Sequence, residues 1–508
     1  MPAPRSCLIL GSGMGGLALG ALLARAGVEV TVLEAHPEFV GGWAHTLHVG
    51  GYRFSAGPRY LWNFGPGQIG RRFLEKCALA ESVPLVELDR RGFDHLYIGD
   101  NEPIRVPNGW SEYEEVLKER FPAEVQGIRQ FFALCRTVFR VFEVMDDERL
   151  YQEPWVRLIW RCLRRRPLSM AWVLRHRYFT LRQAFDLCGL SDGLRQVLSV
   201  NAGLFAQPAE SLSFHAYVAG TLFYHRGCYY PVNDMEGFVG AVVKAIEDHK
   251  GRVLRGQRVV SATATARGVE QVRTQAGDHF AADAVVVNFD PNSFVALIDQ
   301  AEGTASPRLP KYRYSQSASS LFLGVRDARV LEPHFGRWNI WYGSGSAAWS
   351  TPADAGPLDE PTALYLNSPT LVKGVNNDSP PGHATVTAFA PCSYAALKRQ
   401  GPGENGTWKE KHTAALIDLI ARRFVPGLQE AIDVVHLRTP DDNERILGAP
   451  EGNIYGRSFG PREVWTKLPF QGLLPSLYFV GSYVSFAGIA SVIHSACRLY
   501  EELTGDRV

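Results

Sequence analysis

Several features that mark other classes of protein are missing from this 508-residue sequence. The formal net charge is only +1, so no overall field attracts nucleic acid, and we expect no nucleic-acid partner. The eight cysteines are scattered, with no C-x-x-C pair and no zinc-type spacing, which favours reduced thiols and no metal. Neither a signal peptide nor a run of about 18 apolar residues is recognised. These absences predict a cytoplasmic protein, although peripheral membrane attachment stays open.

The length and composition predict a large globular protein. A chain of 508 residues exceeds what one hydrophobic core usually supports, so two domains, interwoven or separate, are expected. Hydrophobic residues make up 46% and charged residues 21%, which is ordinary for a folded enzyme. Such a chain can bury a large ligand.

The N-terminus carries a nucleotide-binding pattern. Residues 6–34 read as strand, glycine turn, helix and strand, with Gly11, Gly13 and Gly16 in the spacing G-x-G-x-x-G. These glycines permit a tight turn, close approach of a pyrophosphate and close packing of helix on strand. Glu34 ends the second strand about 20 residues later, where a carboxylate can accept both ribose hydroxyls. The unit predicts a Rossmann-like domain that binds a dinucleotide.

A second glycine segment links this unit to a known family. Gly41-Gly42-Trp43 is followed by His45-Thr46, and then by Gly57-Pro58. This stretch resembles the second glycine motif of the flavoprotein family that includes amine oxidases, phytoene desaturases, carotenoid isomerases and retinol saturase. His-Thr after the paired glycines is closest to the isomerase and saturase branch, whereas amine oxidases favour Arg where Trp43 stands. The resemblance implies FAD as the cofactor.

The resemblance continues along the chain in the family's order. Val259 matches a position that contacts adenine, and the C-terminal Gly481-Ser482 and Gly488-Ile489 match the flavin motif that opens the last helix. Asn233-Asp234 replaces the family's usual Gly-Gly before Met235. This replacement puts in doubt a close approach of the backbone to flavin at that turn.

The resemblance therefore implies an α/β fold in which a Rossmann-like FAD-binding domain is interwoven with an α+β substrate domain. We assign residues 1–90, 230–292 and 441–508 to the former, and residues 91–229 and 293–440 to the latter. The predicted cofactor-binding residues are Gly11, Gly13, Met14, Gly15, Gly16, Glu34, Ala35, Gly41, Gly42, Trp43, His45, Thr46, Pro58, Arg59, Val259, Gly481, Ser482, Gly488 and Ile489.

Residues 154–177 include a basic amphipathic helix. At about 100° per residue, Arg157, Arg161, Arg164 and Arg165 share one face of the stretch 154–166, opposite a face rich in tryptophan and aliphatic residues. This composition is typical of a helix that lies in a membrane interface. The alternative is that the apolar face packs on the rest of the protein and the basic face is solvated.

The resemblance implies redox chemistry at a carbon–carbon double bond of a long apolar polyene or isoprenoid lipid: desaturation, saturation or isomerisation. Arg59 and Tyr60, directly after Gly57-Pro58, are candidates for substrate contact or proton delivery, although a salt bridge and a packed ring are the simpler explanations. One alternative is a tailoring oxidase of a fatty or polyketide chain. Another is a non-catalytic lipid- or prenyl-binding chaperone on the same fold, which the intact glycine motif disfavours.

Overall fold

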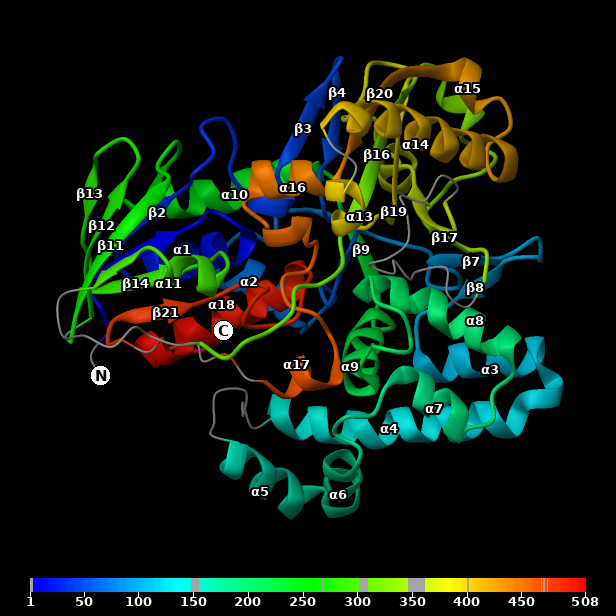
Figure 1. Cartoon of the computed structure of the whole chain (residues 1–508), viewed down its shortest axis with the longest axis horizontal. Helices are drawn as coiled ribbons and strands as arrows, with labels where there is room; N and C mark the ends of the chain where they lie inside the picture. Colours follow the sequence, from blue (N-terminus) through cyan, green and yellow to red (C-terminus); the bar gives the residue numbers. More distant parts are fainter. Residues whose placement is uncertain are drawn as a thin grey trace.

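The computed structural model describes residues 3–147, 155–266, 268–300, 309–345, 361–399, 402–466, 468, 471–472 and 474–508. The two strands of the N-terminal motif belong to a five-stranded parallel sheet (Figure 1). Its order is β10 (Arg252–Leu254), β2 (Glu29–Leu33), β1 (Ser6–Leu10), β14 (Ala284–Val287) and β21 (Leu477–Phe479). The central strands are almost entirely buried and apolar, as expected for a parallel sheet covered on both faces. The predicted Rossmann-like α/β fold is confirmed.

Different layers cover the two faces of this sheet. Ile9 points to the helices α1 (Met14–Arg25), α10 (Asp234–Asp248) and α18 (Ile489–Thr504), whereas its neighbours Leu8 and Leu10 point the other way. This alternation is the two-residue period of a strand. The opposite face packs on a four-stranded sheet. Its order is β13 (His279–Phe280), β12 (Gly268–Thr274), β11 (Val259–Thr265) and β15 (Ile298–Gln300).

A mixed seven-stranded sheet forms the second large layer. Its order is β20 (Ile432–Arg438), β16 (Ala318–Val325), β19 (Ala384–Pro391), β18 (Ala363–Asn367), β17 (Asn339–Gly343), β7 (Asp94–Ile98) and β8 (Ile104–Val106). Helix α14 (Pro402–Arg423) packs on one of its faces. Strand β18 ends at Asn367, although apolar residues continue beyond it. Pro369 starts helix α12 (Pro369–Lys373) there, because proline fits the first helical turn and cannot donate to a sheet.

The helices between residues 110 and 224 form a third hydrophobic core. They are α3 (Trp110–Arg120), α4 (Val125–Asp147), α5 (Trp155–Arg165), α6 (Pro167–Arg175), α7 (Leu181–Leu187), α8 (Asp192–Val200) and α9 (Phe214–Tyr224). The amphipathic helix predicted at 154–166 is present as α5, and Figure 1 shows α5 and α6 at the lower edge of the molecule, below α4.

Shorter elements complete the chain. The strands are β3 (Thr46–Val49) paired with β4 (Tyr52–Ser55), and β5 (Leu61–Trp62), β9 (Cys228–Pro231) and β6 (Leu85–Glu87) in one small sheet. The helices are α2 (Ile69–Lys76), α11 (Pro291–Val295), α13 (Tyr394–Arg399), α15 (Leu428–Ala431), α16 (Pro440–Leu447) and α17 (Pro461–Trp465).

The proposed domain boundaries follow the sheets closely. The five-stranded sheet draws its strands from 1–90, 230–292 and 441–508, and the seven-stranded sheet draws its strands from 91–229 and 293–440. Strand β15 departs from this division, because residues 298–300 pair with β11 of the four-stranded sheet. We therefore propose the division with the boundary at residue 292 moved past residue 300.

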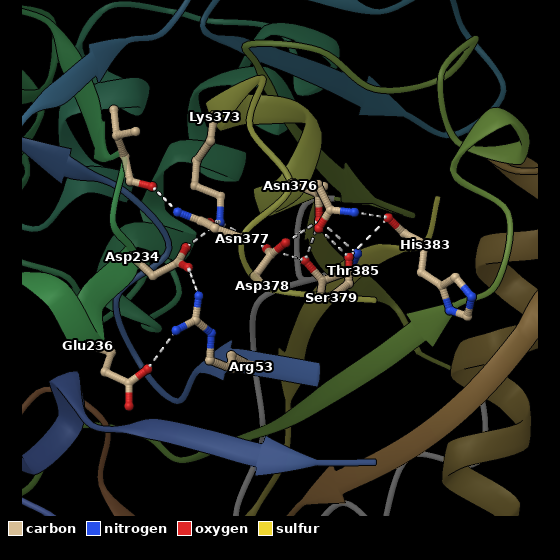
Figure 2. Close-up of polar contacts among 12 residues, drawn as sticks. Arg53, Asp234, Glu236, Lys373, Asn376, Asn377, Asp378, Ser379, His383 and Thr385 are labelled. Carbon is tan, nitrogen blue, oxygen red and sulfur yellow. Dashed lines mark hydrogen bonds and ion pairs between the residues drawn. The ribbon is translucent and has the colours of Figure 1, made fainter. Parts of the chain in front are cut away.

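A buried charge cluster joins the two sheets' regions (Figure 2). The Nζ of Lys373, at the end of α12, lies 2.5 Å from Oδ1 of Asp234 on α10 and 3.1 Å from Oδ2 of Asp378. The Lys373 side chain is fully buried, and its Nζ also donates to Oδ1 of Asn377 at 2.6 Å. Burial raises the pKa of Asp234 to about 6, and the Lys373 ammonium opposes this rise. Two carboxylates therefore share one buried cation.

The Lys373→Met variant tests this junction. Loss of the ammonium leaves the buried Asp378 without a cation and Asp234 with only the partly exposed Arg53, 3.8 Å away. Breaking a buried ion pair in this way typically costs about 3–5 kcal/mol. We expect the free energy of unfolding, measured by urea titration with FAD present, to fall by roughly that amount. Lys398→Met is the matched control, because Lys398 is half exposed and its ion pair with Glu444 is 3.6 Å long, so it should cost less than about 1 kcal/mol. Equal losses in both variants would contradict the assignment.

Candidate functional site

A cavity of about 1310 Å³ opens where the two sheets and the helices meet. One part of its lining comes from the glycine turns that follow β1 and β2 and from the start of α18. The other part comes from β17, β19, α9 and the ends of α4 and α5. The volume exceeds the roughly 300–1,000 Å³ of common small-molecule sites, so a large cofactor and a second ligand can share it.

The N-terminal glycine turn exposes the start of helix α1 to this cavity. Gly13 precedes the helix, no side chain caps it, and Gly11 adopts a φ of +98° that favours glycine. The first backbone N–H groups of α1 are therefore available to an anion. Gly16 lies away from the cavity: a Cβ there would come within 2.6 Å of the Gly11 carbonyl oxygen. The third glycine thus permits close packing of helix on strand, as predicted.

Asn288 fixes the shape of this turn. Its Nδ2 donates to the carbonyl oxygens of Gly11 at 3.1 Å and of Gly13 at 3.0 Å. Asn288 follows β14 directly, and its backbone N–H also donates to Leu10 at 2.9 Å. This role of Asn288 was not identified from the sequence. Nothing in the local sequence pairs Asn288 with a turn about 275 residues away.

Glu34 lies at the end of β2, beside the cavity. Its carboxylate accepts hydrogen bonds from the backbone N–H of His36 at 2.8 Å, the backbone N–H of Ser12 at 3.1 Å, and the Ser12 hydroxyl. These donors orient the carboxylate, which has about four acceptor positions and so keeps capacity for a ligand hydroxyl. Ala35 and Val259 line the same region.

The second glycine motif lies against the first. Gly41 has a φ of +107°, its N–H donates to the Ser12 carbonyl at 3.1 Å, and Gly41 forms an isolated parallel bridge with Gly13. Gly42 and Trp43 follow in a short 3-10 helix (Gly42–Ala44) and line the cavity. The two glycine segments therefore present adjacent backbone surfaces to one ligand.

His45 and Thr46 do not reach the cavity. His45 Nδ1 lies 2.6 Å from the Gly42 carbonyl oxygen, and its Nε2 accepts from Nη1 of Arg438 at 3.2 Å. Burial lowers the pKa of His45 to about 3, so the ring is neutral and its Nδ1 proton can bond Gly42. Thr46 begins β3 with its hydroxyl buried. His45 thus braces the glycine loop from behind, and contact of His45 and Thr46 with a cofactor stays a prediction.

The Gly57-Pro58 segment places Arg59 and Tyr60 at the cavity. Arg59 is 7% exposed, its Nη1 donates to the Ser55 carbonyl at 3.0 Å, and its guanidinium lies 5.1 Å from the Phe322 ring centroid. Burial lowers the pKa of Arg59. Within the described residues no carboxylate pairs with Arg59, so the salt bridge considered from the sequence is absent there. Tyr60 donates its hydroxyl proton to Tyr224 at 3.0 Å.

The C-terminal motif supplies the opposite side of the cavity. Gly488 precedes α18 with a φ of +96° and no side-chain cap, so a second helix N-terminus faces the cavity. Gly481, Ser482 and Ile489 line it as well. The Gly481 N–H donates to the Ser495 hydroxyl at 3.1 Å, which ties the turn to the helix.

Asp234 resolves the doubt raised by the missing Gly-Gly pair. Its φ is +58°, in the left-handed region that glycine would adopt. Aspartate tolerates this region better than most residues do. The turn is thus kept with a side chain that binds Lys373.

The structure gathers most of the predicted cofactor residues around one cavity. They are Gly11, Gly13, Met14, Gly15, Glu34, Ala35, Gly41, Gly42, Trp43, Pro58, Arg59, Val259, Gly481, Ser482, Gly488 and Ile489, with Gly16, His45 and Thr46 behind them. Their direct contact with a cofactor stays a prediction.

The other half of the cavity is mainly apolar and aromatic. Among the aromatic residues of this region, Phe205, Phe223, Tyr224 and Trp341 line it, whereas Phe179, Tyr229, Trp338 and Tyr342 do not. Residues not anticipated from the sequence include Phe142, Met145, Leu158, Leu204, Phe389, Phe459 and Phe486. They come from separate helices, strands and loops, so no local pattern could identify them.

None of the eight cysteines forms a disulfide bond, and all eight are buried. In the part of the chain that the structure describes, no cluster of His, Cys, Asp or Glu could hold a metal ion. Among the same residues, no helix has the length and apolar character needed to cross a membrane.

Two uncapped helix ends, two glycine turns and an oriented acid around one cavity define a dinucleotide-binding protein. The chain belongs to the family of flavin-containing amine oxidoreductases, whose model matches residues 14–499. FAD is therefore its cofactor. The uncapped N-terminus of α1, with Gly13, Gly41 and Gly42 beside it in the cavity lining, fits the diphosphate of such a cofactor.

Similar proteins support this assignment over the full length. All-trans-retinol 13,14-reductase of Danio rerio is 24% identical, over 98% of this chain and 85% of that protein. Phytoene desaturase (lycopene-forming) of Pseudescherichia vulneris is 25% identical, over 97% of each. The structure of cyclohexylamine oxidase from Brevibacterium oxydans has a TM-score of 0.63 at 15% identity, covering 98% of this chain and 99% of that one.

The Asn288→Ala variant tests the glycine turn. Two hydrogen bonds to the turn are lost, each worth about 1 kcal/mol, so we expect the Kd for FAD to rise roughly 10- to 100-fold. Fluorescence titration of the apoprotein with FAD measures this. Asn101→Ala, which removes an exposed amide that bonds only the Ile98 carbonyl at 2.9 Å, is the control. An unchanged Kd in Asn288→Ala would show that the turn holds its shape without this side chain.

Proposed function

We propose that this FAD-dependent oxidoreductase acts on carbon–carbon double bonds of a long apolar polyene or isoprenoid lipid. The observation that carries the proposal is the continuity of the cavity, in which the glycine-lined half opens directly into the aromatic half. A flat conjugated chain packs well on aromatic faces and buries apolar surface there. Desaturation, saturation and isomerisation all place such a chain beside the cofactor.

The lining of the aromatic half supports a substrate without charge. Phe223, Trp341 and Phe389 come from α9, β17 and β19, and Leu158 and Met145 continue the surface toward α5. The relatives named as a retinol reductase and a phytoene desaturase take such molecules by their names. A fatty or polyketide chain remains the alternative substrate, because the same surface would accept it.

FAD, when bound, supplies the transfer of hydride at the double bond. The residues of this chain would hold the cofactor by backbone N–H groups at Gly13 and Gly488, orient its ribose at Glu34, and position the substrate against it. Exclusion of water by the aromatic surfaces would keep both in one orientation, and that orientation is the main contribution of the protein to rate.

We also propose that α5 and α6 attach the protein to a membrane surface from which substrate enters. The predicted single apolar face of α5 is divided in the structure: Leu158 and Cys162 are buried, whereas Val156 and Trp160 are 79% and 58% exposed. Leu168 on α6 is 86% exposed. The Trp155 side chain lies outside the described residues. The packed apolar face considered from the sequence therefore accounts for only part of the helix.

Charge and position favour a lipid surface as the partner. Residues 155–177 contain seven arginines and no acidic residue, and the Arg164 guanidinium lies 5.6 Å from the Trp160 ring centroid. Exposed tryptophan beside arginine suits the headgroup region of an anionic bilayer. Leu158 on the same helix lines the cavity, so a bound membrane would lie next to its entrance.

The substrate class is tested by the spectrum and contents of the purified protein. We expect the absorbance bands of bound FAD and, after extraction, a long apolar polyene or isoprenoid by mass spectrometry. A fatty or polyketide molecule in the extract would favour the tailoring oxidase. A colourless protein that cannot be reconstituted with FAD would refute catalysis and favour the lipid-binding chaperone.

Membrane attachment is tested by Trp160→Glu combined with Leu168→Glu. Each wild-type side chain is worth about 1.5–3 kcal/mol when moved from water to an apolar environment, so we expect at least a tenfold loss of binding to vesicles of phosphatidylcholine with phosphatidylglycerol. Flotation of the full chain with vesicles gives the bound fraction. The control is Val375→Glu, a 47% exposed residue after α12. Equal binding by all three proteins would exclude α5 and α6 as the membrane contact.

A further inference from the structure

A hydrogen-bonded chain leads from the cavity to a carboxyl group behind its lining. Tyr60 and Tyr224 both line the cavity, and Tyr60 donates to Tyr224 at 3.0 Å. Tyr224 in turn donates to Oδ2 of Asp94, which has no solvent exposure. Asp94 lies at the start of β7, Tyr224 ends α9, and Tyr60 precedes β5, so three distant segments build this chain.

Asp94, at the far end of this hydrogen-bonded chain, is held in place by further hydrogen bonds. Asn339 Nδ2 donates to Oδ1 of Asp94 at 2.8 Å, and the Tyr365 hydroxyl donates to Oδ1 of Asn339 at 2.7 Å. Asn367 Nδ2 lies 3.4 Å from the same Asn339 oxygen. Each Asp94 oxygen thus has a fixed donor, and within the described residues no lysine or arginine pairs with it. Hydrogen bonds alone stabilise its charged form.

We propose that Tyr60 is the proton donor or acceptor for the substrate, and that Tyr224 and Asp94 are positioning residues that set the direction of its O–H bond. The proposal rests on the proposed function and adds the proton path to it. When Asp94 is a carboxylate, both hydroxyl protons point toward it and the Tyr60 oxygen offers a lone pair to the cavity. When Asp94 is protonated, the chain reverses and Tyr60 can donate into the cavity.

When this hydrogen-bonded chain delivers a proton to the substrate, each hydroxyl gives up one proton and receives another. A C–H bond forms at one carbon of the double bond while the Tyr60 O–H bond breaks, Tyr60 takes the proton of Tyr224, and Tyr224 takes the proton of Asp94. Asp94 is left as a carboxylate. Reduced FAD, when bound, would supply the hydride for the other carbon, which balances the reduction of the alkene against the oxidation of the flavin. Desaturation runs the same proton movements backward.

The environment of Asp94 allows both states near neutral pH. Burial raises the pKa of Asp94 to about 7, against the lowering effect of hydrogen bonds from Tyr224, Asn339 and Trp341. Burial also raises the pKa of Tyr60 and of Tyr224 well above the usual value, so both hydroxyls stay protonated and pass protons without ionising alone. The titratable groups that face Asp94 are Tyr60, Tyr224 from α9, Cys228 from β9 and Tyr365 from β18.

The first experiment needs no turnover. Infrared difference spectra of the FAD-loaded protein, taken while pH is raised, should show a protonated carboxyl band of Asp94 that disappears near pH 7, above the band of Asp234, whose pKa is about 6. The band should be missing in Asp94→Asn and should disappear at higher pH in Tyr224→Phe, which removes a donor to the carboxylate. Tyr217→Phe is the matched control, because Tyr217 is buried on the same helix and its hydroxyl bonds only the Leu198 carbonyl at 3.4 Å. Its titration should equal that of the wild type.

The second experiment measures rates with a polyene substrate. We expect Tyr60→Phe to lower kcat about 100-fold with KM changed less than twofold, because a positioned acid or base contributes about 10²–10⁴ to rate. The wild-type kcat should change through about pH 7, falling with rising pH if the proton is delivered and rising if it is removed. That change should vanish in Asp94→Asn and persist in Tyr217→Phe.

The outcomes separate the two proposals. A carboxyl band that titrates near pH 7, with no polyene turned over, would refute the proposed function and leave the hydrogen-bonded switch in place. Turnover without that band, or with a pH profile unchanged in Asp94→Asn, would overturn the relay alone. If Asp94→Asn fails to fold, the wild-type titration and the kcat of Tyr60→Phe still decide, since Tyr60→Phe removes only one hydroxyl.

Discussion

The common edge at which the parallel strands end is the constraint on which the site depends. Strands β1, β2, β14 and β21 are parallel, so their carboxyl ends lie at one edge of the sheet. The groups that follow them are Gly11, Glu34, Asn288 and Gly481, and all four line the cavity. Residues as far apart in the sequence as 11 and 481 meet at this edge because each follows a strand of the same parallel sheet. The backbone hydrogen bonds of the sheet thus determine where a cofactor can bind.

The second half of the cavity exists only if the other sheet is held in place. Lys373, shared by Asp234 and Asp378, fixes α12 of that region to the start of α10. A buried ion cluster of this kind adds little net stability compared with apolar packing, but a displaced arrangement would leave charges unpaired. The cluster therefore favours one relative position of the two regions, and that position gives the cavity its shape.

The cavity combines two different surfaces. Backbone N–H groups and the Glu34 carboxylate serve a polar cofactor, whereas aromatic rings serve an apolar ligand. Tyr60, Tyr224 and Asp94 lie where the apolar surface meets a polar network, so a proton source there is shielded from bulk water. The same low-dielectric surroundings raise the pKa of Asp94 and make its charge state responsive near neutral pH.

The sequence by itself determined the parallel sheet, the glycine turns, the last helix and the presence of amphipathic α5. These are local patterns: the spacing of Gly11, Gly13 and Gly16 and the apolar runs of the strands are set by backbone geometry within a few residues. The order in which the family's motifs recur along the chain then implied FAD as the cofactor. The placement of His45 and Thr46 behind the loop and the division of the α5 face could not be read this way. Each depends on which distant surface packs against the segment.

Only the tertiary structure decided the aromatic half of the cavity, the clamp by Asn288, the Lys373 cluster and the path from Tyr60 to Asp94. Asp94 reads in the sequence as one acid at the start of a strand, and its partners Tyr224 and Asn339 are 130 and 245 residues away. A carboxyl group acquires an unusual pKa from burial and from donors brought by the fold, and neither is encoded in its neighbours along the chain.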